Sequence, residues 1–243
     1  MLLVIDGDTL LYSISVIDNT IDVVYKIFDN KLKKILNKFD TNEYIFILEG
    51  NRNFRNKYDI NYKKHRTAEK PKHFKALKSY IVNKYKNNLI LATNIETDDV
   101  CSIVATKCLE LDIHYVIVHI DKDLNQIIGQ HYNPNKDEEY YVDEDYAKYI
   151  LCYQIIKGDV TDSKITGIKG YGDKKAFELL NYAKDNNIDY LTASFNEFIK
   201  VYGDVKGVYN FYVSFNIINL LTTYPKLNTK IDKLINVVHK TEL

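Results

Sequence analysis

Cysteine is scarce in this sequence of 243 residues, which contains Cys101, Cys108 and Cys152. The three form no C-x-x-C pair and their number is odd, so a disulfide framework is not indicated. No set of cysteines and histidines lies close together in the sequence, which argues against a zinc site. We expect reduced, buried thiols.

Long apolar runs are also missing. No stretch approaches the ~18 apolar residues of a membrane-spanning helix, and the segment Met1–Asp8 is too short and too acidic for a signal peptide. There is no internal repeat and no low-complexity linker. We therefore expect a cytoplasmic protein that does not bind a membrane. Its length suits one sizeable core, in a domain with a subdomain.

The net charge is zero, so the overall charge indicates no partner, but its distribution is uneven. The segment from Arg52 to Lys78 holds ten Lys or Arg against two acids, whereas the segment from Asp137 to Asp145 holds six acids and no Lys or Arg. Segregation on this scale predicts that the basic segment faces a polyanion. A solvated lysine-rich helix face is the alternative.

Short apolar runs alternate with helical patterns in the first part of the chain. Runs at 2–5, 44–48 and 115–120 are typical of buried parallel strands. The spacing of apolar residues predicts helices between them, with Thr97 as the N-cap of one. After Pro134 the pattern becomes helical, and Tyr146, Tyr149 and Tyr153 are predicted to share a helix face. The fold class is α/β, a parallel sheet followed by a helical portion.

Acidic residues follow these apolar runs in five clusters spread over about 150 residues. Because the carboxyl ends of parallel strands meet at one edge of a sheet, the acids are expected to lie close together there. The nine carboxylates are Asp6, Glu49, Glu96, Asp98, Asp99, Asp121, Asp123, Asp159 and Asp162.

Each acidic cluster taken alone has a simple structural alternative. Asp98 and Asp99 could complement a helix dipole, and Asp121 with Asp123 could form a turn. Asp8, two residues after Asp6, could be a turn residue or a ligand. Together, however, so many carboxylates would repel one another unless cations were bound. Oxygen-only ligands suit Mg²⁺ or Mn²⁺.

A glycine-rich segment, KGDVTDSKITGIKGYGDKKA, runs from Lys157 to Ala176. Its glycines are expected to form a turn between two helices, where backbone N–H groups of the second helix can hold a phosphate. A helix C-cap is the alternative, but the preceding acids Asp159 and Asp162 make the pattern more specific.

Five motifs in this order resemble the structure-specific 5′-nucleases, namely flap endonucleases, phage 5′-exonucleases and the N-terminal nuclease domain of bacterial DNA polymerase I. The motifs are VIDG around Asp6, NFRNKYDINYKKHR from Asn53, ETDD from Glu96, IDKDLNQI from Ile120 and the glycine-rich segment. Glu49 stands where many members have Asp, and Ser163 and Thr166 replace a frequent Asn and Pro. The length of the chain is similar to that of phage members of the family. A phage protein of this kind would be located in the host cytoplasm.

The resemblance implies a PIN-like nuclease core over residues 1–143, with a helical arch at about 52–88. It also implies a helical DNA-binding portion over 144–243, with a helix-three-turn-helix (helix-hairpin-helix) module at about 146–184. The implied activity is a two-metal 5′–3′ exonuclease or flap endonuclease that acts during replication or repair. The expected partner is DNA with a 5′ single-stranded end or flap, or an RNA–DNA hybrid, and the expected state is a monomer.

The same resemblance implies roles for single residues. Asp6, Glu49, Glu96, Asp98 and Asp121 would surround one Mg²⁺ or Mn²⁺ ion, and Asp123, Asp159 and Asp162 a second, with Asp99 near both. Lys63 and Lys175 would act on the scissile phosphate, and a terminal base would stack on Tyr62. The hairpin would hold K⁺. The residues expected to contact DNA are Arg52, Arg55, Lys64, Arg66, Lys70, Lys72, Lys75, Gly167, Lys169, Gly170, Gly172 and Lys174.

Two alternatives to this function stay open on the sequence. A PIN-type ribonuclease shares an acidic core but usually lacks the arch and the glycine hairpin. A non-catalytic DNA-binding relative would be expected to have lost carboxylates, whereas this chain has nine.

Overall fold

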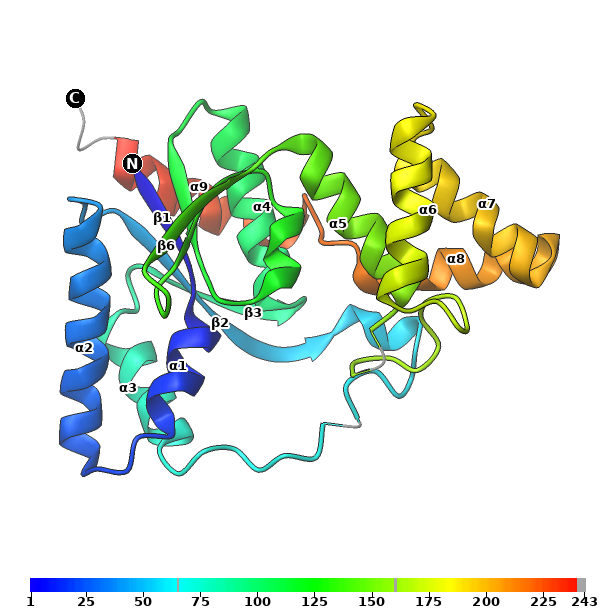
Figure 1. The fold of residues 1–243 in the computed structure, drawn as a ribbon. Helices are drawn as coiled ribbons and strands as arrows, with labels where there is room; N and C mark the ends of the chain where they lie inside the picture. Colours follow the sequence, from blue (N-terminus) through cyan, green and yellow to red (C-terminus); the bar gives the residue numbers. More distant parts are fainter. Residues whose placement is uncertain (65, 160, 240–243) are drawn as a thin grey trace. The chain divides into compact units, whose positions relative to one another are not determined.

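The structure, a computed structural model, describes residues 1–64, 66–159 and 161–239 (Figure 1). His65 of the YKKHR stretch, Val160 of the glycine-rich segment and residues 240–243 lie outside the described residues. The chain divides into two compact units. Unit 1 comprises Met1–Arg52, Glu69–Val142 and the segment from Leu221 onward, and unit 2 comprises Asn53–Ala68 and Asp143–Leu220.

Unit 1 is built on a six-stranded sheet in the order β3-β2-β1-β4-β5-β6. Its strands are β1 (Leu2–Asp6), β2 (Tyr44–Asn53), β3 (Leu89–Asn94), β4 (Tyr115–Val118), β5 (Gly129–Asn133) and β6 (Glu138–Val142). β1 pairs in parallel with β2 and β4, and β4 pairs in parallel with β5. The five residues of β1 are all buried, as the uninterrupted apolar run LLVI predicts for a strand covered on both faces.

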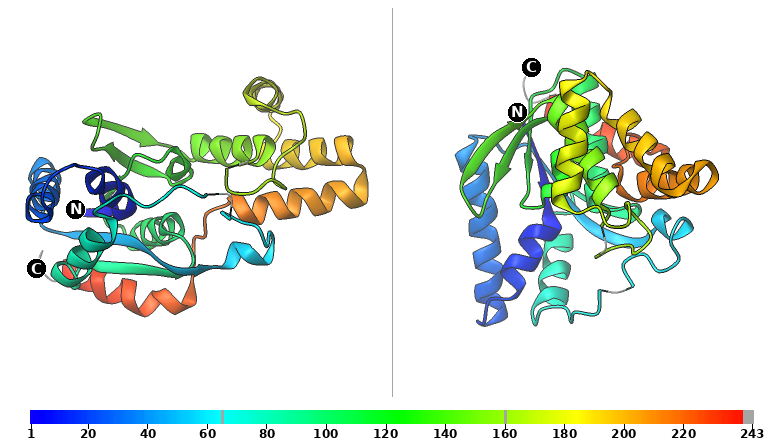
Figure 2. Two further views of the ribbon diagram at one scale, coloured as in Figure 1. Left: turned by 90° about the horizontal axis from the view of Figure 1, so that it is seen from below. Right: turned by 45° about the vertical axis from the view of Figure 1, so that its right-hand side comes forward.

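Helices cover the sheet of unit 1. α1 (Gly7–Ser15), α2 (Ile21–Lys38) and α3 (Phe74–Lys84) contact one another (Figure 2). α2 buries Val24, Phe28, Leu32 and Ile35, which lie one helical turn apart, in the same core cluster as alternate residues of β1, β2 and β4. α4 (Thr97–Glu110) contacts β1, β3 and β4.

Two further elements complete unit 1, and one short helix opens unit 2. η2 (Lys122–Gln126) lies between β4 and β5, and α9 (Pro225–His239) belongs to the C-terminal segment of unit 1. The short helix η1 (Phe54–Lys57) follows β2 directly, at the start of unit 2.

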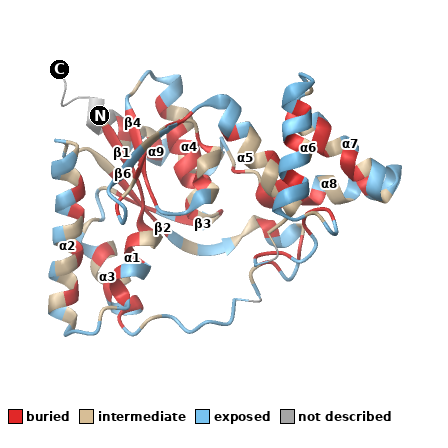
Figure 3. Cartoon of the chain, viewed as in Figure 1, coloured by how far each residue is buried: buried red, intermediate tan, exposed pale blue. Residues whose placement is uncertain are grey.

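Unit 2 is helical and has its own core. Its helices are α5 (Glu144–Lys157), α6 (Asp173–Asp185), α7 (Tyr190–Tyr202) and α8 (Asp204–Ile218). Ile155 and Ile156 of α5, Leu180 of α6 and Phe198 of α7 are buried in one cluster. The buried residues lie on the inner faces of these helices and the exposed ones on the outer faces (Figure 3). No helix within the described ranges combines the length and the apolar character needed to cross a membrane.

The α/β fold class is confirmed, but three details differ from the prediction. The acidic segment after Pro134 contains a strand, β6, which pairs antiparallel with β5 at the sheet edge. The N-cap of α4 is Glu96 rather than Thr97, because Glu96 and Asp99 form a reciprocal capping box. On α5 the fully buried face carries Ala147, Cys152, Ile155 and Ile156, while Tyr146 is exposed.

The three cysteines are free and buried, as the sequence predicts. Burial raises the pKa of the Cys108 thiol and of the Cys152 thiol to about 12. A thiol reacts as the thiolate, so neither side chain is a candidate nucleophile near neutral pH.

Candidate active site

The first group of acids in unit 1 lies toward the carboxyl ends of three neighbouring parallel strands. Asp6 ends β1 and pairs in register with Ile47 of β2, two residues before Glu49. Ile5 of β1 pairs with Val118 of β4, three residues before Asp121. The strand register therefore places Asp6, Glu49 and Asp121 at one edge of the sheet, as the sequence predicts.

Asp6 is a buried carboxylate that also begins a helix. It is the N-cap of α1, where Oδ1 accepts the backbone N–H of Asp8 (3.1 Å) and of Thr9 (3.4 Å), and Oδ2 accepts the Thr9 hydroxyl. Burial raises the pKa of Asp6 to about 7, and the charges of Asp8 and Asp121 act in the same direction, against the hydrogen bonds from Thr9. An ionised Asp6 is therefore costly here without a cation.

Asp8 lies in the first turn of α1 and accepts hydrogen bonds through only one of its carboxylate oxygens. Oδ2 accepts the backbone N–H of Glu49 (2.9 Å) and the hydroxyl of Thr97 (2.5 Å). Among the described residues, Oδ1 of Asp8 is one of two buried side-chain polar atoms that have no hydrogen-bond partner. Burial raises the pKa of Asp8, and the Glu49 charge raises it further. A buried acceptor without a donor is costly, and a bound cation would satisfy it.

The start of α4 adds two further acids to this region. Burial raises the pKa of the Cys101 thiol well above its usual value, and the charges of Asp6, Asp98, Asp8 and Asp99 raise it further. These four carboxylates therefore all act on the Cys101 thiol in unit 1. Their combined charge makes the region strongly electronegative.

Backbone N–H groups donate hydrogen bonds to both carboxylate oxygens of Asp99. Oδ2 accepts the N–H of Glu96 (3.0 Å) within the capping box, and Oδ1 accepts the N–H of Leu221 (3.0 Å). Asp99 thus fixes the start of α4 and anchors the C-terminal segment of unit 1. These contacts give the residue a structural role that the sequence did not reveal.

The loop after β4 carries Asp121 and Asp123. Oδ1 of Asp121 accepts the N–H of Asp123 (3.0 Å) and caps η2. Beneath this loop the buried His119 contacts the backbone oxygen of Asp121 through Nδ1 (2.5 Å) and the ring of His131 through Nε2 (2.7 Å). The imidazole rings of His119 and His131 thus support the loop that carries the acidic pair.

The chemistry of this donor set fits a hard divalent cation. Its side chains supply carboxylate oxygens, the ligands that Mg²⁺ and Mn²⁺ prefer. Within the described residues no three His, Cys, Asp or Glu side chains already lie together as a metal-binding group. The observation that fits a cation is therefore the buried Oδ1 of Asp8, which lacks a donor beside the buried Asp6.

Unit 2 holds the remaining pair of predicted ligands, and here cationic side chains surround one of them. Asp162 is buried, and its Oδ1 accepts Nε of Arg66 (2.7 Å). Its Oδ2 lies 3.4 Å from Nζ of Lys63 and 3.3 Å from the hydroxyl of Tyr62. Asp159 is less buried, and its Oδ1 accepts the N–H of Thr161 (3.0 Å). The structure thus brings Tyr62, Lys63 and Arg66 of the YKKHR stretch onto Asp162.

Lys63 is held in an unusual backbone conformation. Its φ of 57° lies in the left-handed region, which residues other than glycine and asparagine seldom adopt. Its N–H donates to the backbone oxygen of Asp162 (2.8 Å), and its ammonium group pairs with the carboxylate of the same residue. Two contacts from one acid therefore fix both the backbone and the side chain of Lys63.

The glycine-rich segment forms the connection between α5 and α6. Gly167 has a φ of 83°, and a side chain there would meet the backbone of Lys157 and Gly158 at 2.7 Å or less. Gly170 and Gly172 have open space around them. Ser163 and Thr166, which depart from the family pattern, support the loop: the Ser163 hydroxyl donates to Asp59 (2.6 Å), and the Thr166 hydroxyl accepts the N–H of Asp159 (3.0 Å).

Two residues that the sequence predicts to contact the substrate are buried in the structure. Arg55, expected to contact DNA, is 1% exposed and donates to the backbone oxygens of Ile217 (2.6 Å) and Asn219 (3.2 Å). Tyr62, expected to stack on a terminal base, is 6% exposed and packs in the core cluster of unit 2. Both predictions fail in this structure, because neither side chain presents a free surface.

The other basic residues differ in their surroundings. Lys70 lies over the rings of Tyr12 and Phe74, and Lys72 pairs with Asp18 (3.2 Å), both in unit 1. Lys175 lies over the ring of Tyr171 in unit 2. The remaining members of the predicted set are exposed: Arg52, Lys64, Lys75, Lys169 and Lys174.

Two residues that the sequence analysis did not assign to the acidic region touch it. The hydroxyl of Thr97 binds Asp8, and Nζ of Lys78 donates to the backbone oxygen of Glu49 (2.5 Å). The Lys78 charge lowers the pKa of Asp8, although burial outweighs it. Lys78 is one basic residue among many in its segment, so only the fold distinguishes it.

A divalent cation is expected to raise the thermal stability of the wild-type chain. At a Mg²⁺ concentration about 100 times the dissociation constant, binding adds about 2.7 kcal/mol, or roughly 5–10 °C in Tm for a chain of this size. Asp8→Asn keeps the acceptor for Glu49 and Thr97 but removes the buried charge. We expect a higher Tm without cation and a smaller Mg²⁺ response, measured by calorimetry. An unchanged Mg²⁺ response in this variant would show that Asp8 does not contribute to the cation site.

Comparison with known proteins agrees with this architecture. Residues 1–149 match the family model of the 5′-3′ exonuclease N-terminal resolvase-like domain. The chain therefore belongs to this 5′-nuclease family.

Solved structures of similar fold come from bacteriophage T5. One is a T5 protein co-crystallized with metal ions, with a TM-score of 0.73 and 14% sequence identity over 97% of this chain and 98% of that one. A mutant of the T5 5′-exonuclease has a TM-score of 0.70 at 14% identity and the same coverage. A complex of the T5 flap endonuclease with DNA and metal ions has a TM-score of 0.60 at 15% identity, over 87% of this chain and 97% of that one. At this identity the likeness shows the shared fold.

Proposed function

We propose that this chain is a divalent-metal-dependent 5′-nuclease that hydrolyses phosphodiester bonds near 5′ ends or 5′ flaps of DNA. The observation that carries the proposal is the buried Asp6 beside the half-buried Asp8 at the carboxyl edge of the sheet, with one buried oxygen of Asp8 lacking any donor. Family membership supports the reaction class, and the metal ions and DNA named with the T5 structures support the cofactor and substrate classes.

In this proposal the acids of the two units hold two cations, Mg²⁺ or Mn²⁺. Bound ions of this kind polarise a phosphodiester and promote attack by water. Asp6, Asp8, Glu49, Glu96, Asp98, Asp121 and Asp123 supply oxygens in unit 1, and Asp159 and Asp162 supply oxygens in unit 2. Asp99 orders the start of α4, from which Asp98 projects. The glycine hairpin is proposed to contact the duplex backbone, together with K⁺.

The cationic side chains have a separate task in this proposal. Lys63 and Lys175 stabilise negative charge on the scissile phosphate. In this structure Asp162 pairs with Lys63 and Arg66. Tyr62 acts through its hydroxyl contact with Asp162 rather than as a stacking surface.

A substrate panel tests the proposed function. A 5′-labelled flap duplex is incubated with the protein and Mg²⁺, beside a blunt duplex, a nicked duplex and an RNA–DNA hybrid. We expect a short labelled product from the flap. Preferential cleavage of structured RNA would instead identify a ribonuclease. Binding without cleavage of any substrate would identify a non-catalytic DNA-binding protein.

A further inference from the structure

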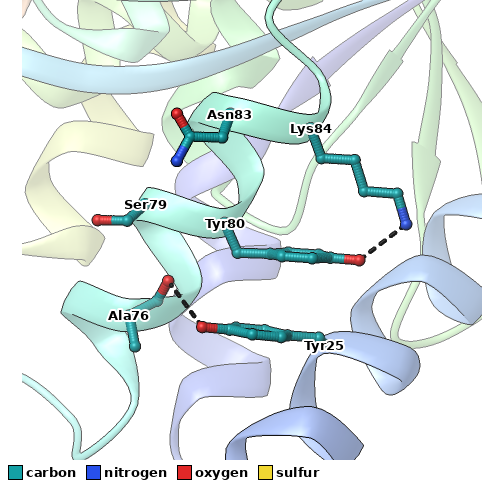
Figure 4. A pocket seen from close by; sticks show the side chains of 6 residues that line it. All are labelled: Tyr25, Ala76, Ser79, Tyr80, Asn83 and Lys84. Carbon is teal, nitrogen blue, oxygen red and sulfur yellow. Dashed lines mark hydrogen bonds between the residues drawn. The ribbon is translucent and has the colours of Figure 1, made fainter.

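A pair of stacked tyrosines lies on unit 1 in the surface between α2 and α3. Tyr25 of α2 and Tyr80 of α3 have ring centroids 4.1 Å apart and an angle of 4° between their planes. Figure 4 shows the two rings one above the other. Both rings pack against the apolar core of unit 1, but neither is fully buried, so the stack keeps an accessible surface. The described acidic site does not use it.

Hydrogen bonds fix the stack in place. The Tyr80 hydroxyl donates to Asp29 (2.7 Å), which also accepts Nζ of Lys84 (2.6 Å) and the hydroxyl of Tyr85 (2.6 Å). The Tyr25 hydroxyl donates to the backbone oxygen of Ala76 (3.4 Å). The ring positions are therefore set before any ligand arrives, which lowers the entropic cost of binding at this surface.

The stacked rings form the aromatic part of an open pocket of about 700 Å³. The rest of the lining comes from α3: Ala76, Ser79, Asn83 and Lys84 (Figure 4). Three kinds of group thus meet in one place. The aromatic rings offer an apolar surface, Ser79 and Asn83 offer a hydroxyl and an amide, and Lys84 offers an ammonium group that also pairs with Asp29. This volume lies within the usual range of small-molecule sites.

The charge around the pocket favours a polyanion. From Lys70 to Lys86 the sequence contains six lysines and no acid. The one carboxylate in the tyrosine network, Asp29, accepts three donors and pairs with Lys84. Lys75, on the helix turn before Ser79, is exposed. Basic residues interleaved with aromatic rings are typical of surfaces that bind single-stranded nucleic acid.

We propose that this pocket, lined by Tyr25, Ala76, Ser79, Tyr80, Asn83 and Lys84, binds one nucleobase of a single strand whose phosphates follow the lysines of α3. The base would lie against the tyrosine pair, with its polar edge on Asn83 and Ser79. None of the described carboxylates lines the pocket, so the site takes no part in the chemistry. The inference rests on the proposed nuclease function for its biological substrate, although the binding itself requires no cleavage.

Binding without metal tests this site. A fluorescein-labelled dT12 is titrated in EDTA by anisotropy. We expect Ala76→Glu and Asn83→Glu each to weaken binding about tenfold, the loss of one base contact at an aromatic surface. Both positions are exposed and leave the Asp29 network intact. Asn37→Glu adds the same charge at an exposed α2 position outside the pocket and is expected to bind as the wild type does.

Photo-crosslinking locates the contact. With 5-iododeoxyuridine in the strand, we expect crosslinks at Tyr25 or Tyr80, found by mass spectrometry. Crosslinks only at other residues, or wild-type affinity in both glutamate variants, would overturn the proposal. So would equal competition by thymidine monophosphate, which would identify a free nucleotide as the ligand. Crosslinks at these tyrosines without flap cleavage in Mg²⁺ would retain this site while removing the proposed nuclease function.

Discussion

Asp6→Asn is expected to lower the rate of 5′-flap cleavage by about a hundredfold to ten-thousandfold, because loss of a bound cation removes several kcal/mol of transition-state stabilisation. The asparagine keeps an oxygen that can accept the N–H groups of Asp8 and Thr9, so α1 retains its cap. Cleavage is measured under single-turnover conditions. Glu110→Gln removes an exposed carboxylate at the end of α4 and is expected to cleave at the wild-type rate.

The same variant has a second expected effect that does not depend on activity. Burial and neighbouring acids raise the pKa of Asp6, so the ionised side chain destabilises the cation-free fold. Asp6→Asn should therefore have a higher Tm than the wild type in EDTA at pH 8. Loss of cleavage together with a lower Tm would indicate damage to the fold rather than loss of a ligand.

Lys63→Ala is expected to lower cleavage by about a hundredfold to a thousandfold, the usual cost of removing one group that stabilises transition-state charge. Arg66 and Tyr62 would still contact Asp162, so this carboxylate keeps partners and unit 2 should stay folded. The measurement compares single-turnover cleavage in Mg²⁺ with flap binding in Ca²⁺. We expect binding to change little.

Lys57→Ala is the matched control for this position. Lys57 is exposed in η1 of the same unit and lies outside the proposed site. Its replacement should leave cleavage within about twofold of the wild type, as is usual for exposed surface changes. Equal rates for Lys63→Ala and the wild type would exclude Lys63 from the reaction.

The grouping of acids in unit 1 could be predicted because it follows from two local rules. Apolar runs such as LLVI mark buried strands, and parallel strands bring their carboxyl ends to one edge. The sequence alone therefore predicts that Asp6 and Asp121 lie close together. Asp8 could not be assigned in the same way, since a turn residue and a ligand have the same local pattern. Only the fold shows that one of its oxygens is buried without a donor.

The failures concern side chains whose burial depends on distant residues. Arg55 lies in a basic segment that predicts DNA contact, yet its guanidinium caps carbonyls more than 160 residues away. Tyr62 is likewise taken up by the core of unit 2. Strand β6 differs from the helical pattern predicted after Pro134, because an edge strand tolerates charged residues such as Glu138 and Glu139. Charge patterns indicate a segment's partner but not the environment of each side chain.

The central claim is that carboxylates of both units bind the cations that drive cleavage. It is tested most directly by the Mg²⁺ dependence of 5′-flap cleavage in the wild type, in Asp121→Asn of unit 1 and in Asp159→Asn of unit 2. We predict no cleavage in EDTA, cleavage that rises with Mg²⁺ in the wild type, and a loss of at least about a hundredfold in each variant. Cleavage that persists in EDTA, or at wild-type rates in both variants, would contradict the claim.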